Sequence, residues 1–417
     1  LYDGSPTYPD NTVLWQFADE EEFSHFGTSA KYIETLMKND VNPSAIFKLS
    51  NLKVICSTGS PLSAECYDYI YKNVGYVHLA SISGGTDIVS CFVLGVPSIP
   101  VRRGEIQGAG LGMAVEIWDP HFHIWDVSEN TESGHDSSEL FAPQDDPVYT
   151  LTKYEEDMAA DGFKLSGGAF VEAVSVCHVN KDGPQFESAC EAETGWVSSQ
   201  LEESTLDYVL VASAPLESPR IDQILASLKR YPKVCGIRQI INHEPSWPRN
   251  KKRGNFLENP QWLKGFSLLS SHHLAFDLQL NPNQFDKAVN LGTKHPDIPI
   301  IIGHLGSPTL TDLEKKQQYW EGIRELAYLE HASIKISMLS YIDPYWYKNS
   351  LIEETVHQVI ELFGVERCFF ASNFPVEKHL GWSAHRLYSV FLNMVSYLDE
   401  ESQQKLFADN AKKTYGQ

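Results

Sequence analysis

Short apolar runs alternate with amphipathic segments along most of the chain. Eight runs with strand character lie at residues 113–118, 169–176, 208–214, 234–240, 274–280, 299–304, 333–338 and 368–373. Segments between them, such as 218–230, 284–295 and 351–363, repeat apolar residues with helical spacing. Eight strand–helix units within roughly 260 residues predict an α/β fold, a (β/α)₈ TIM barrel with right-handed crossovers. An open doubly wound sheet is the alternative, but the first turn lacks the glycines typical of that fold.

The first 118 residues follow a different pattern. Helices are expected at 29–38 and 63–73, and strands at 53–57 and 76–80. A glycine-rich turn, Gly84-Gly85-Thr86-Asp87, follows the second strand. These elements are too few for a complete sheet. The chain is therefore predicted to consist of a partial α/β segment, residues 1–118, followed by the barrel, residues 119–417.

Polar residues gather where the predicted barrel strands end. The string Asp119-Pro120-His121-Phe122-His123 ends the first strand, and side chains two residues apart in a strand point to the same face. The later strands contribute Glu172 (second), Arg238 (fourth), Asp277 and Gln279 (fifth), His304 (sixth), Lys335 (seventh) and Asn373 (eighth). Active sites of βα barrels lie at the carboxyl ends of the strands, so these residues form the candidate site.

The charged residues of this set allow two interpretations. Glu172 and Asp277 balance Arg238 and Lys335, so ion pairs could neutralise the barrel interior without a metal ion. Alternatively, Arg238 binds a substrate carboxylate, to which a guanidinium fork is suited. His243 follows the fourth strand and is a further candidate for substrate binding.

Composition narrows the class of partner. The net charge of −22 and a pI near 5.0 argue against a nucleic-acid partner or an anionic membrane surface, so a small-molecule substrate is expected. No apolar run approaches the roughly 20 residues that span a bilayer, and no signal peptide opens the chain, so the expected location is cytoplasmic. Seven cysteines without C-x-x-C spacing indicate neither a disulfide framework nor a cysteine metal site. Glu187, Glu191 and Glu193 are expected to mark a solvated helix face.

Several motifs of the barrel half resemble one family. They are Asp119-Pro120-His121-Phe122-His123-Ile124-Trp125-Asp126, Gly236-Ile237-Arg238, Phe276-Asp277-Leu278-Gln279, Gly303-His304-Leu305-Gly306, Ala371-Ser372-Asn373-Phe374-Pro375 and Asp409-Asn410-Ala411. Together they are similar to the amidohydrolase-related (amidohydrolase 2) family, which includes sugar lactonases and pyrone-dicarboxylate lactone hydrolases. The resemblance covers nearly all of the chain beyond residue 118.

The resemblance implies a hydrolase that adds water to a lactone or cyclic ester. His121, His123 and His304 would bind a divalent metal, Zn²⁺ or Mn²⁺, or in metal-free relatives polarise the lactone carbonyl. Arg238, with Asp277 and His243, would bind the substrate.

The eighth strand departs from the family pattern. Related enzymes carry an aspartate there that takes a proton from the attacking water, whereas this chain has Asn373 among the catalytic positions. A carboxamide cannot accept that proton at neutral pH. Glu377, His379 and Asp277 are the substitutes that the sequence offers.

The first 118 residues resemble the acetoacetyl-CoA synthetases of the adenylate-forming ligases. The matching stretches include Phe26-Gly27-Thr28-Ser29-Ala30, Ser57-Thr58-Gly59-Ser60-Pro61 and Leu79 to Cys91. The resemblance implies that Gly59 and Ser60 flank an adenine, that Thr86 contacts a phosphate and that Asp87 helps to hold Mg²⁺. The phosphate loop, the ribose-binding segment and the domain with the catalytic lysine are absent from the sequence. The nucleotide site is thus expected to be vestigial, with neither ATP nor CoA used and no ligase activity.

Three readings of the whole chain remain open. The first is a lactone hydrolase fused to a non-functional ligase fragment. The second is an acetoacetate–CoA ligase product joined to the barrel by gene fusion or a faulty gene model, which the transcript across 116–121 would reveal. The third is a barrel that has lost catalysis through Asn373 and serves as a binding module.

Overall fold

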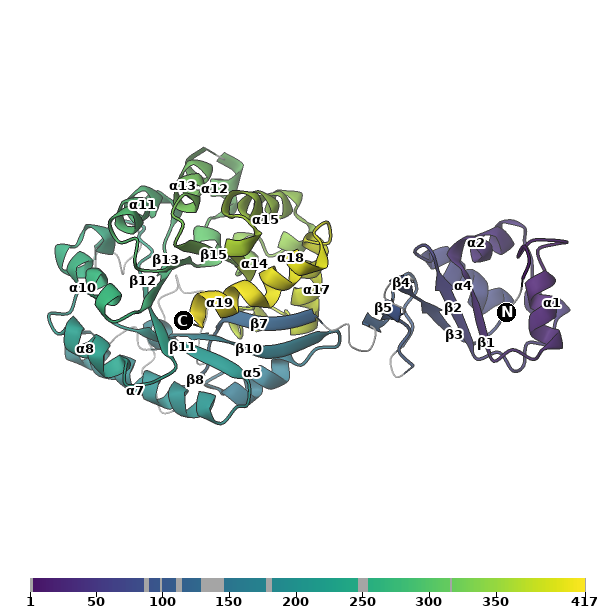
Figure 1. The fold of residues 1–417 in the computed structure, drawn as a ribbon, viewed down its shortest axis with the longest axis horizontal. Coiled ribbons are helices and arrows are strands. Elements are labelled where there is room, and N and C mark those ends of the chain that lie inside the picture. The colour runs from purple at the N-terminus through teal and green to yellow at the C-terminus, as the bar shows by residue number, and fades with distance from the viewer. Residues whose placement is uncertain are drawn as a thin grey trace. The chain divides into compact units, whose positions relative to one another are not determined.

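The computed structural model describes residues 3–85, 90–97, 100–109, 115–128, 146–177, 182–246, 254–315 and 317–416. The chain forms two compact units, Leu1–Ala114 and Val115–Gln417, and each is described by itself (Figure 1). The division falls four residues before the boundary expected from sequence, because Val115 already pairs with Phe163 in the first barrel strand. Among the described residues, none of the helices combines the length and the apolar character needed to cross a membrane.

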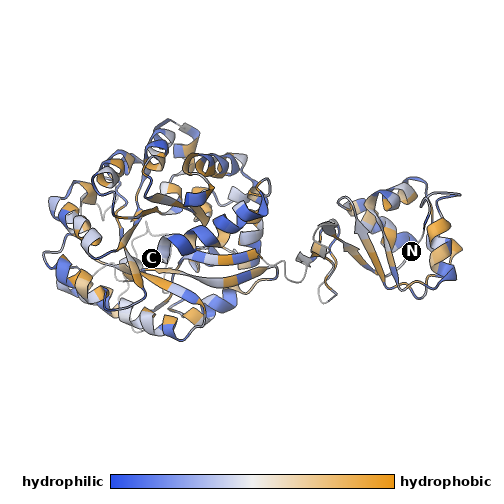
Figure 2. Cartoon of the chain, in the orientation of Figure 1, coloured by the Kyte–Doolittle hydropathy of each residue, from blue (hydrophilic) through white to orange (hydrophobic). Residues whose placement is uncertain are grey.

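The larger unit confirms the predicted parallel barrel. Its strands follow chain order around the sheet: β7 (Val115–Phe122), β10 (Phe163–Val171), β11 (Asp207–Ser213), β12 (Val234–Ile240), β13 (Ala275–Gln279), β14 (Ile300–Ile302), β15 (Ala332–Ile336) and β16 (Cys368–Phe370). All seven pairings between neighbours are parallel. Figure 2 shows the strands mostly in the hydrophobic colour and the surrounding helices in mixed colours, as expected for strands covered on both faces.

Helices surround these strands. They are α5 (Leu151–Met158), α6 (Val174–Cys177), α7 (Gly183–Glu202), α8 (Ile221–Leu228), α10 (Pro260–Ser271), α11 (Phe285–Lys294), α12 (Leu310–Lys315), α13 (Gln317–Ala327), α14 (Leu339–Ile342), α15 (Ser350–Phe363), α16 (Val376–His379), α17 (Ala384–Met394), α18 (Glu400–Gln404) and α19 (Asn410–Tyr415). A two-stranded ribbon, β8 (Trp125–Asp126) with β9 (Val148–Tyr149), follows β7. The predicted helices at 218–230, 284–295 and 351–363 correspond to α8, α11 and α15.

Helix α19 closes one end of the barrel (Figure 1). Its Tyr415 packs in a buried cluster with Trp118, Ile301 and Phe369. Trp118 and Ile301 precede His121 and His304 by three positions, and Phe369 precedes Asn373 by four. The helix therefore covers the interior on the side away from the predicted site.

Two local predictions were wrong. The apolar run 169–176 is not one strand: β10 ends at Val171, and Glu172 lies just beyond it rather than inside the strand. The reason is that one carboxylate oxygen of Glu172 accepts the backbone N–H of Ser175 at 2.9 Å, which turns the chain into α6.

The prediction of a solvated face holds for one of the three glutamates of α7. Glu191 is exposed and accepts a hydrogen bond from Ser227 in α8, whereas Glu187 is partly buried and accepts one from Ser218. Glu193 accepts the backbone N–H of Ala173 at 2.9 Å. Burial, together with the charge of nearby Glu172, raises the pKa of Glu193 well above its usual range.

The smaller unit is a three-stranded parallel sheet with helices. Its elements are α1 (Val13–Glu20), β1 (His25–Ser29), α2 (Ala30–Lys38), α3 (Pro43–Ile46), β2 (Val54–Thr58), α4 (Ala64–Asn73) and β3 (His78–Ser81), with sheet order β1-β2-β3. A small antiparallel sheet of β4 (Ser83–Gly85), β5 (Ser90–Leu94) and β6 (Gly108–Ala109) was not predicted. The core of the smaller unit contains Trp15, Phe26, Ile55 and Ile70.

The closing seam of the barrel lies between β7 and β16. Regular pairing is replaced there by a single bridge, Phe122 with Phe374. Backbone hydrogen bonds of 2.8 Å run from Asn373 N to His121 O and from His123 N to Phe374 O.

The carboxylate of Asp119 reinforces this seam. It accepts the backbone N–H of Ser372 at 2.9 Å, the Ser372 hydroxyl at 2.5 Å and the Tyr154 hydroxyl at 2.8 Å. It also accepts the N–H of His121 at 3.3 Å. Asp119 is fully buried, so these donors offset the cost of removing a carboxyl group from water.

Replacing Asp119 with alanine should therefore destabilise the barrel by at least about 3 kcal/mol, because several buried donors lose their acceptor. Urea unfolding measures this loss, and faster hydrogen exchange at the amides of His123 and Asn373 locates it at the seam. The matched control is Asp157→Ala, which removes a partly exposed carboxylate that also accepts from a tyrosine, Tyr149. Equal losses in the two variants would contradict a special role for Asp119.

Candidate active site

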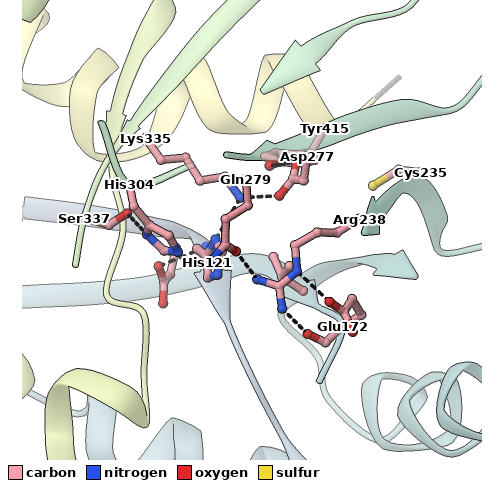
Figure 3. Close-up of polar contacts among 12 residues, drawn as sticks. His121, Glu172, Cys235, Arg238, Asp277, Gln279, His304, Lys335, Ser337 and Tyr415 are labelled. Atoms are coloured by element: carbon pink, nitrogen blue, oxygen red, sulfur yellow. Dashed lines mark hydrogen bonds and ion pairs between the residues drawn. The ribbon is translucent and has the colours of Figure 1, made fainter. Parts of the chain in front are cut away.

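Three imidazoles converge at the strand tips. His121 and His123 come from the end of β7, and His304 from the single turn that follows β14. The ring centroids of His121 and His123 lie 4.9 Å apart, and those of His121 and His304 lie 4.6 Å apart. All three side chains are buried. Figure 3 shows His121 and His304 facing each other.

The backbone at these tips is unusual. His304, Leu305, Met338 and Asn373 all have positive φ, between 54° and 57°. Such conformations cost non-glycine residues roughly 1–3 kcal/mol each and cluster at functional sites. Three successive strand tips thus hold strained residues beside the histidines.

Each imidazole has its Nδ1 atom engaged. Nδ1 of His123 lies 2.7 Å from the carbonyl oxygen of Val171, and Nδ1 of His304 lies 2.9 Å from the hydroxyl of Ser337. Nδ1 of His121 lies 3.1 Å from the ammonium of Lys335. Nε2 of His121 is buried without a hydrogen-bond partner among the described residues.

These contacts assign the protons. A carbonyl oxygen only accepts, so His123 donates from Nδ1. An ammonium only donates, so His121 accepts at Nδ1 and, being neutral, carries its proton on Nε2. The structure therefore presents His121 as an N–H donor with a free hydrogen.

The site favours neutral histidines. Burial is the main cause that lowers the pKa of all three, and the positive charges of Lys335 and Arg238 add to it. The pKa of His123 falls to about 3, and those of His121 and His304 fall well below the usual range.

Asn373 acts on His123 in the opposite direction. Its side chain interacts with His123 and raises the pKa of that imidazole, but burial lowers it by more. An aspartate in its place would favour the protonated imidazole more strongly.

The charged residues form two buried ion pairs. Arg238 donates from Nε to Glu172 at 2.8 Å, and its other nitrogens donate to the Glu172 carbonyl and to Gln279. Lys335 donates to Asp277 at 2.5 Å. The ion pairs that the sequence suggested are therefore present (Figure 3).

Both carboxylate oxygens of Asp277 are already hydrogen-bonded, which leaves neither for the substrate-binding role expected from the sequence. One of its oxygens accepts from Lys335 and the other accepts the hydroxyl of Tyr415 at 2.7 Å. It is equally unsuited to be the general base. Arg238, by contrast, keeps two of its five N–H groups outside these bonds.

The remaining sequence candidates lie further out. His243 is half-buried in the loop after β12, where its backbone N–H is held by Gln284 at 2.9 Å. His379 is exposed at the end of α16. In the smaller unit, Gly59 and Ser60 form the exposed turn after β2, whereas Thr86 and Asp87 lie outside the described residues.

Glu377 is buried, and one of its oxygens accepts the hydroxyl of Ser340 at 2.5 Å. Ser340 in turn accepts from the Trp346 indole at 3.1 Å, so the carboxyl group belongs to a contact between α16 and α14. Burial raises the pKa of Glu377 to about 7, although the hydrogen bond from Ser340 opposes the shift.

Sequence reasoning missed Ser337 and Tyr415. Ser337 lies two positions after Lys335, so the same period-two argument that paired His121 with His123 would have found it. Tyr415 comes from the last helix, and no local pattern connects it with the strand tips.

The imidazoles, as arranged, do not fit a divalent metal. His121 carries its proton on Nε2, so at most His123 and His304 could offer an Nε2 lone pair, and two ligands are too few for the site. Within the described ranges, no group of three or more His, Cys, Asp or Glu side chains could hold a metal ion. The metal-free alternative of the sequence analysis suits these donors.

The purified chain should accordingly contain far less than one equivalent of zinc or manganese, because the Lys335 ammonium and the Nε2 proton of His121 leave too few lone pairs. Elemental analysis of the protein tests this, and EDTA should leave the unfolding temperature unchanged. A stoichiometric metal whose removal lowers that temperature would contradict the prediction.

Glu377 predicts a pH dependence of stability. Its folded pKa lies above the usual 4.5, so its stabilising contribution is complete below about pH 4.5 and is lost as the pH rises through about 7. Glu377→Gln removes this titration. The free energy of unfolding of the variant, relative to wild type, should therefore rise from pH 5 to pH 8 by at most about 3 kcal/mol. Urea unfolding at both pH values measures the difference. A constant difference would show that Glu377 is ionised throughout.

The N-terminal 120 residues match only part of their relatives. The acetoacetyl-coenzyme A synthetase of Rhizobium meliloti (strain 1021) is 57% identical over 120 residues, which are 28% of this chain and 18% of that protein. The chain thus spans about a fifth of the length of the curated synthetases that it matches. The resemblance to a ligase fragment is confirmed at this level.

The barrel matches its relatives over their whole length. The uncharacterized protein y4mH of Sinorhizobium fredii (strain NBRC 101917 / NGR234) is 29% identical over 304 residues, 72% of this chain and 98% of that protein. An amidohydrolase from Burkholderia multivorans with bound zinc has a TM-score of 0.56 at 20% identity, covering 72% of this chain and 99% of that one.

A probable 2-pyrone-4,6-dicarboxylic acid hydrolase from Acinetobacter baumannii, with citric acid bound, has a TM-score of 0.54 at 14% identity, covering 72% of this chain and 99% of that one. At these identities the two solved structures share the fold. The profile of the amidohydrolase family matches residues 118–417. Through its barrel, which carries the histidines described above, the chain belongs to the amidohydrolase family.

Proposed function

We propose that the barrel hydrolyses a lactone or cyclic ester of a small sugar acid or dicarboxylate. The observation that carries this proposal is the set of three buried, neutral imidazoles at the strand tips, with the Nε2 proton of His121 unpartnered. An N–H donor in a buried site stabilises the negative charge that develops on a carbonyl oxygen when water adds.

The roles follow from the proton positions. His121 donates from Nε2 to the carbonyl oxygen, and the Lys335 ammonium at its Nδ1 keeps that donor in place. His304 accepts a proton from water at Nε2 when its own proton lies on Nδ1 and is donated to the Ser337 hydroxyl. His123 donates from Nδ1 to the carbonyl of Val171, which fixes the orientation of its ring beside His121.

The weak base points to an activated carbonyl. Burial lowers the pKa of His304, so the imidazole removes a proton less effectively than an ordinary histidine. Such a base suits a lactone with a good leaving group better than an amide. Arg238, with two N–H groups free for a carboxylate, supports an acidic substrate. The relative named a probable pyrone-dicarboxylate hydrolase supports the same class.

A binding module without turnover is the second candidate function. Asn373 favours it, because the usual carboxylate is missing and general-base catalysis is worth about 10²–10⁴-fold. The ligase reading has weaker support, since the match covers 18% of the synthetase. Neither ATP nor CoA has a place in the proposed reaction.

The purified full chain should hydrolyse at least one member of a panel of sugar lactones and pyrone dicarboxylates, measured by acid release. His121→Gln and His304→Gln should each lower kcat/KM by about 10²-fold or more, since they remove the carbonyl donor and the base. The matched control is His272→Gln, which removes an imidazole paired with Asp222 outside the barrel interior.

Asn373→Asp distinguishes the two candidates further. Under the hydrolase reading it should lower activity, because Asp favours a protonated His123 and disturbs the neutral set. A wild-type chain that hydrolyses no member of the panel, yet is stabilised by one of them, would establish the binding module instead.

A further inference from the structure

A line of hydrogen bonds runs from the last helix of the chain to His121. The hydroxyl of Tyr415, in α19, donates to one oxygen of Asp277 at 2.7 Å. The other oxygen of Asp277 accepts from Lys335 at 2.5 Å, and Lys335 donates to Nδ1 of His121 at 3.1 Å. Figure 3 shows these four residues close together in the barrel interior.

Every member of this line is buried. Tyr415 is 2% exposed, Asp277 3% and Lys335 0%. A buried ammonium requires a counter-charge, and a buried carboxylate requires donors at both oxygens. Asp277 supplies the counter-charge for Lys335, and the hydroxyl of Tyr415 supplies the donor to the second oxygen of Asp277. The ring of Tyr415 also lies 5.2 Å from the Lys335 ammonium, which is favourable for a cation.

The hydrogen bond between Lys335 and His121 determines which nitrogen of His121 carries the proton. The ammonium has no lone pair, so Nδ1 of His121 must accept and the single proton of the neutral ring must lie on Nε2. Without Lys335 no donor would exclude a proton from Nδ1, so the two tautomers could exchange and part of the population would present a lone pair to the carbonyl.

We propose that Tyr415, Asp277 and Lys335 are positioning residues that hold His121 in its Nε2–H tautomer. The catalytic consequence rests on the proposed function, in which that N–H binds the substrate carbonyl. The assignment of the tautomer does not rest on the proposed function, because it follows from the contacts alone.

The chain contains a matched arrangement elsewhere. The hydroxyl of Tyr149 donates to Asp157 at 2.8 Å, Lys378 donates to the same carboxylate at 2.6 Å, and its ammonium lies 5.3 Å from the Tyr149 ring. This second line ends at Lys378, which is partly exposed, rather than at a catalytic histidine. Tyr149→Phe is therefore the control for Tyr415→Phe.

The test is nitrogen-15 NMR of the full chain labelled at histidine, with His121 assigned by the signals lost in His121→Gln. In the wild-type chain, Nε2 of His121 should be protonated and Nδ1 unprotonated. Lys335→Met should shift both nitrogens toward the averaged values of exchanging tautomers. Tyr415→Phe should move them in the same direction by less, while Tyr149→Phe leaves them unchanged. On a hydrolysed lactone, Tyr415→Phe should lower kcat about tenfold, typical for a histidine's positioning partner, with little change in KM.

The wild-type spectrum decides the matter even if Lys335→Met does not fold. A His121 protonated on Nδ1 would overturn the proposal, and equal spectra for Tyr415→Phe and Tyr149→Phe would remove Tyr415 from it. These spectra need no substrate. A chain that hydrolyses no lactone but shows the expected tautomer therefore refutes only the proposed function, whereas hydrolysis with the other tautomer refutes only this inference.

Discussion

The buried carboxylate of Asp119 joins the first and last strands of the barrel, and the geometry of the site depends on that join. Parallel pairing runs from β7 round to β16, but the seam itself has a single bridge and a few hydrogen bonds. Asp119 ties Ser372 to β7 at the level of the histidines. His121, His123 and Asn373 are neighbours because this seam is closed.

Ion pairing controls the electrostatics of the barrel interior. Arg238 pairs with Glu172 and Lys335 pairs with Asp277, so each buried charge has a partner of opposite sign. Burial and the two cations together keep the histidines uncharged. The site can therefore act through an oriented N–H group rather than through a full charge on an imidazole. Asn373 opposes the lowering of the pKa at His123, but burial outweighs it.

Much of the fold was predictable because it depends on local patterns. Apolar runs and helical spacing located the barrel strands and helices such as α8, α11 and α15. The placement of Glu172 failed because its side chain starts a helical turn, which apolar periodicity does not register. The small antiparallel sheet of the N-terminal unit was missed, since β4 and β6 have only three and two residues.

The sequence by itself determined which chemical groups stand at the strand tips, because a period of two and a βα repeat fix where side chains emerge. Only the tertiary structure decided which groups touch. Lys335 lies 214 positions from His121, and Tyr415 lies 138 positions from Asp277. Closure of the barrel and docking of α19 create these contacts, and the proton on His121 is assigned by them. Spacing along the chain carries no information about pairs that meet only when the ends of a sheet are joined.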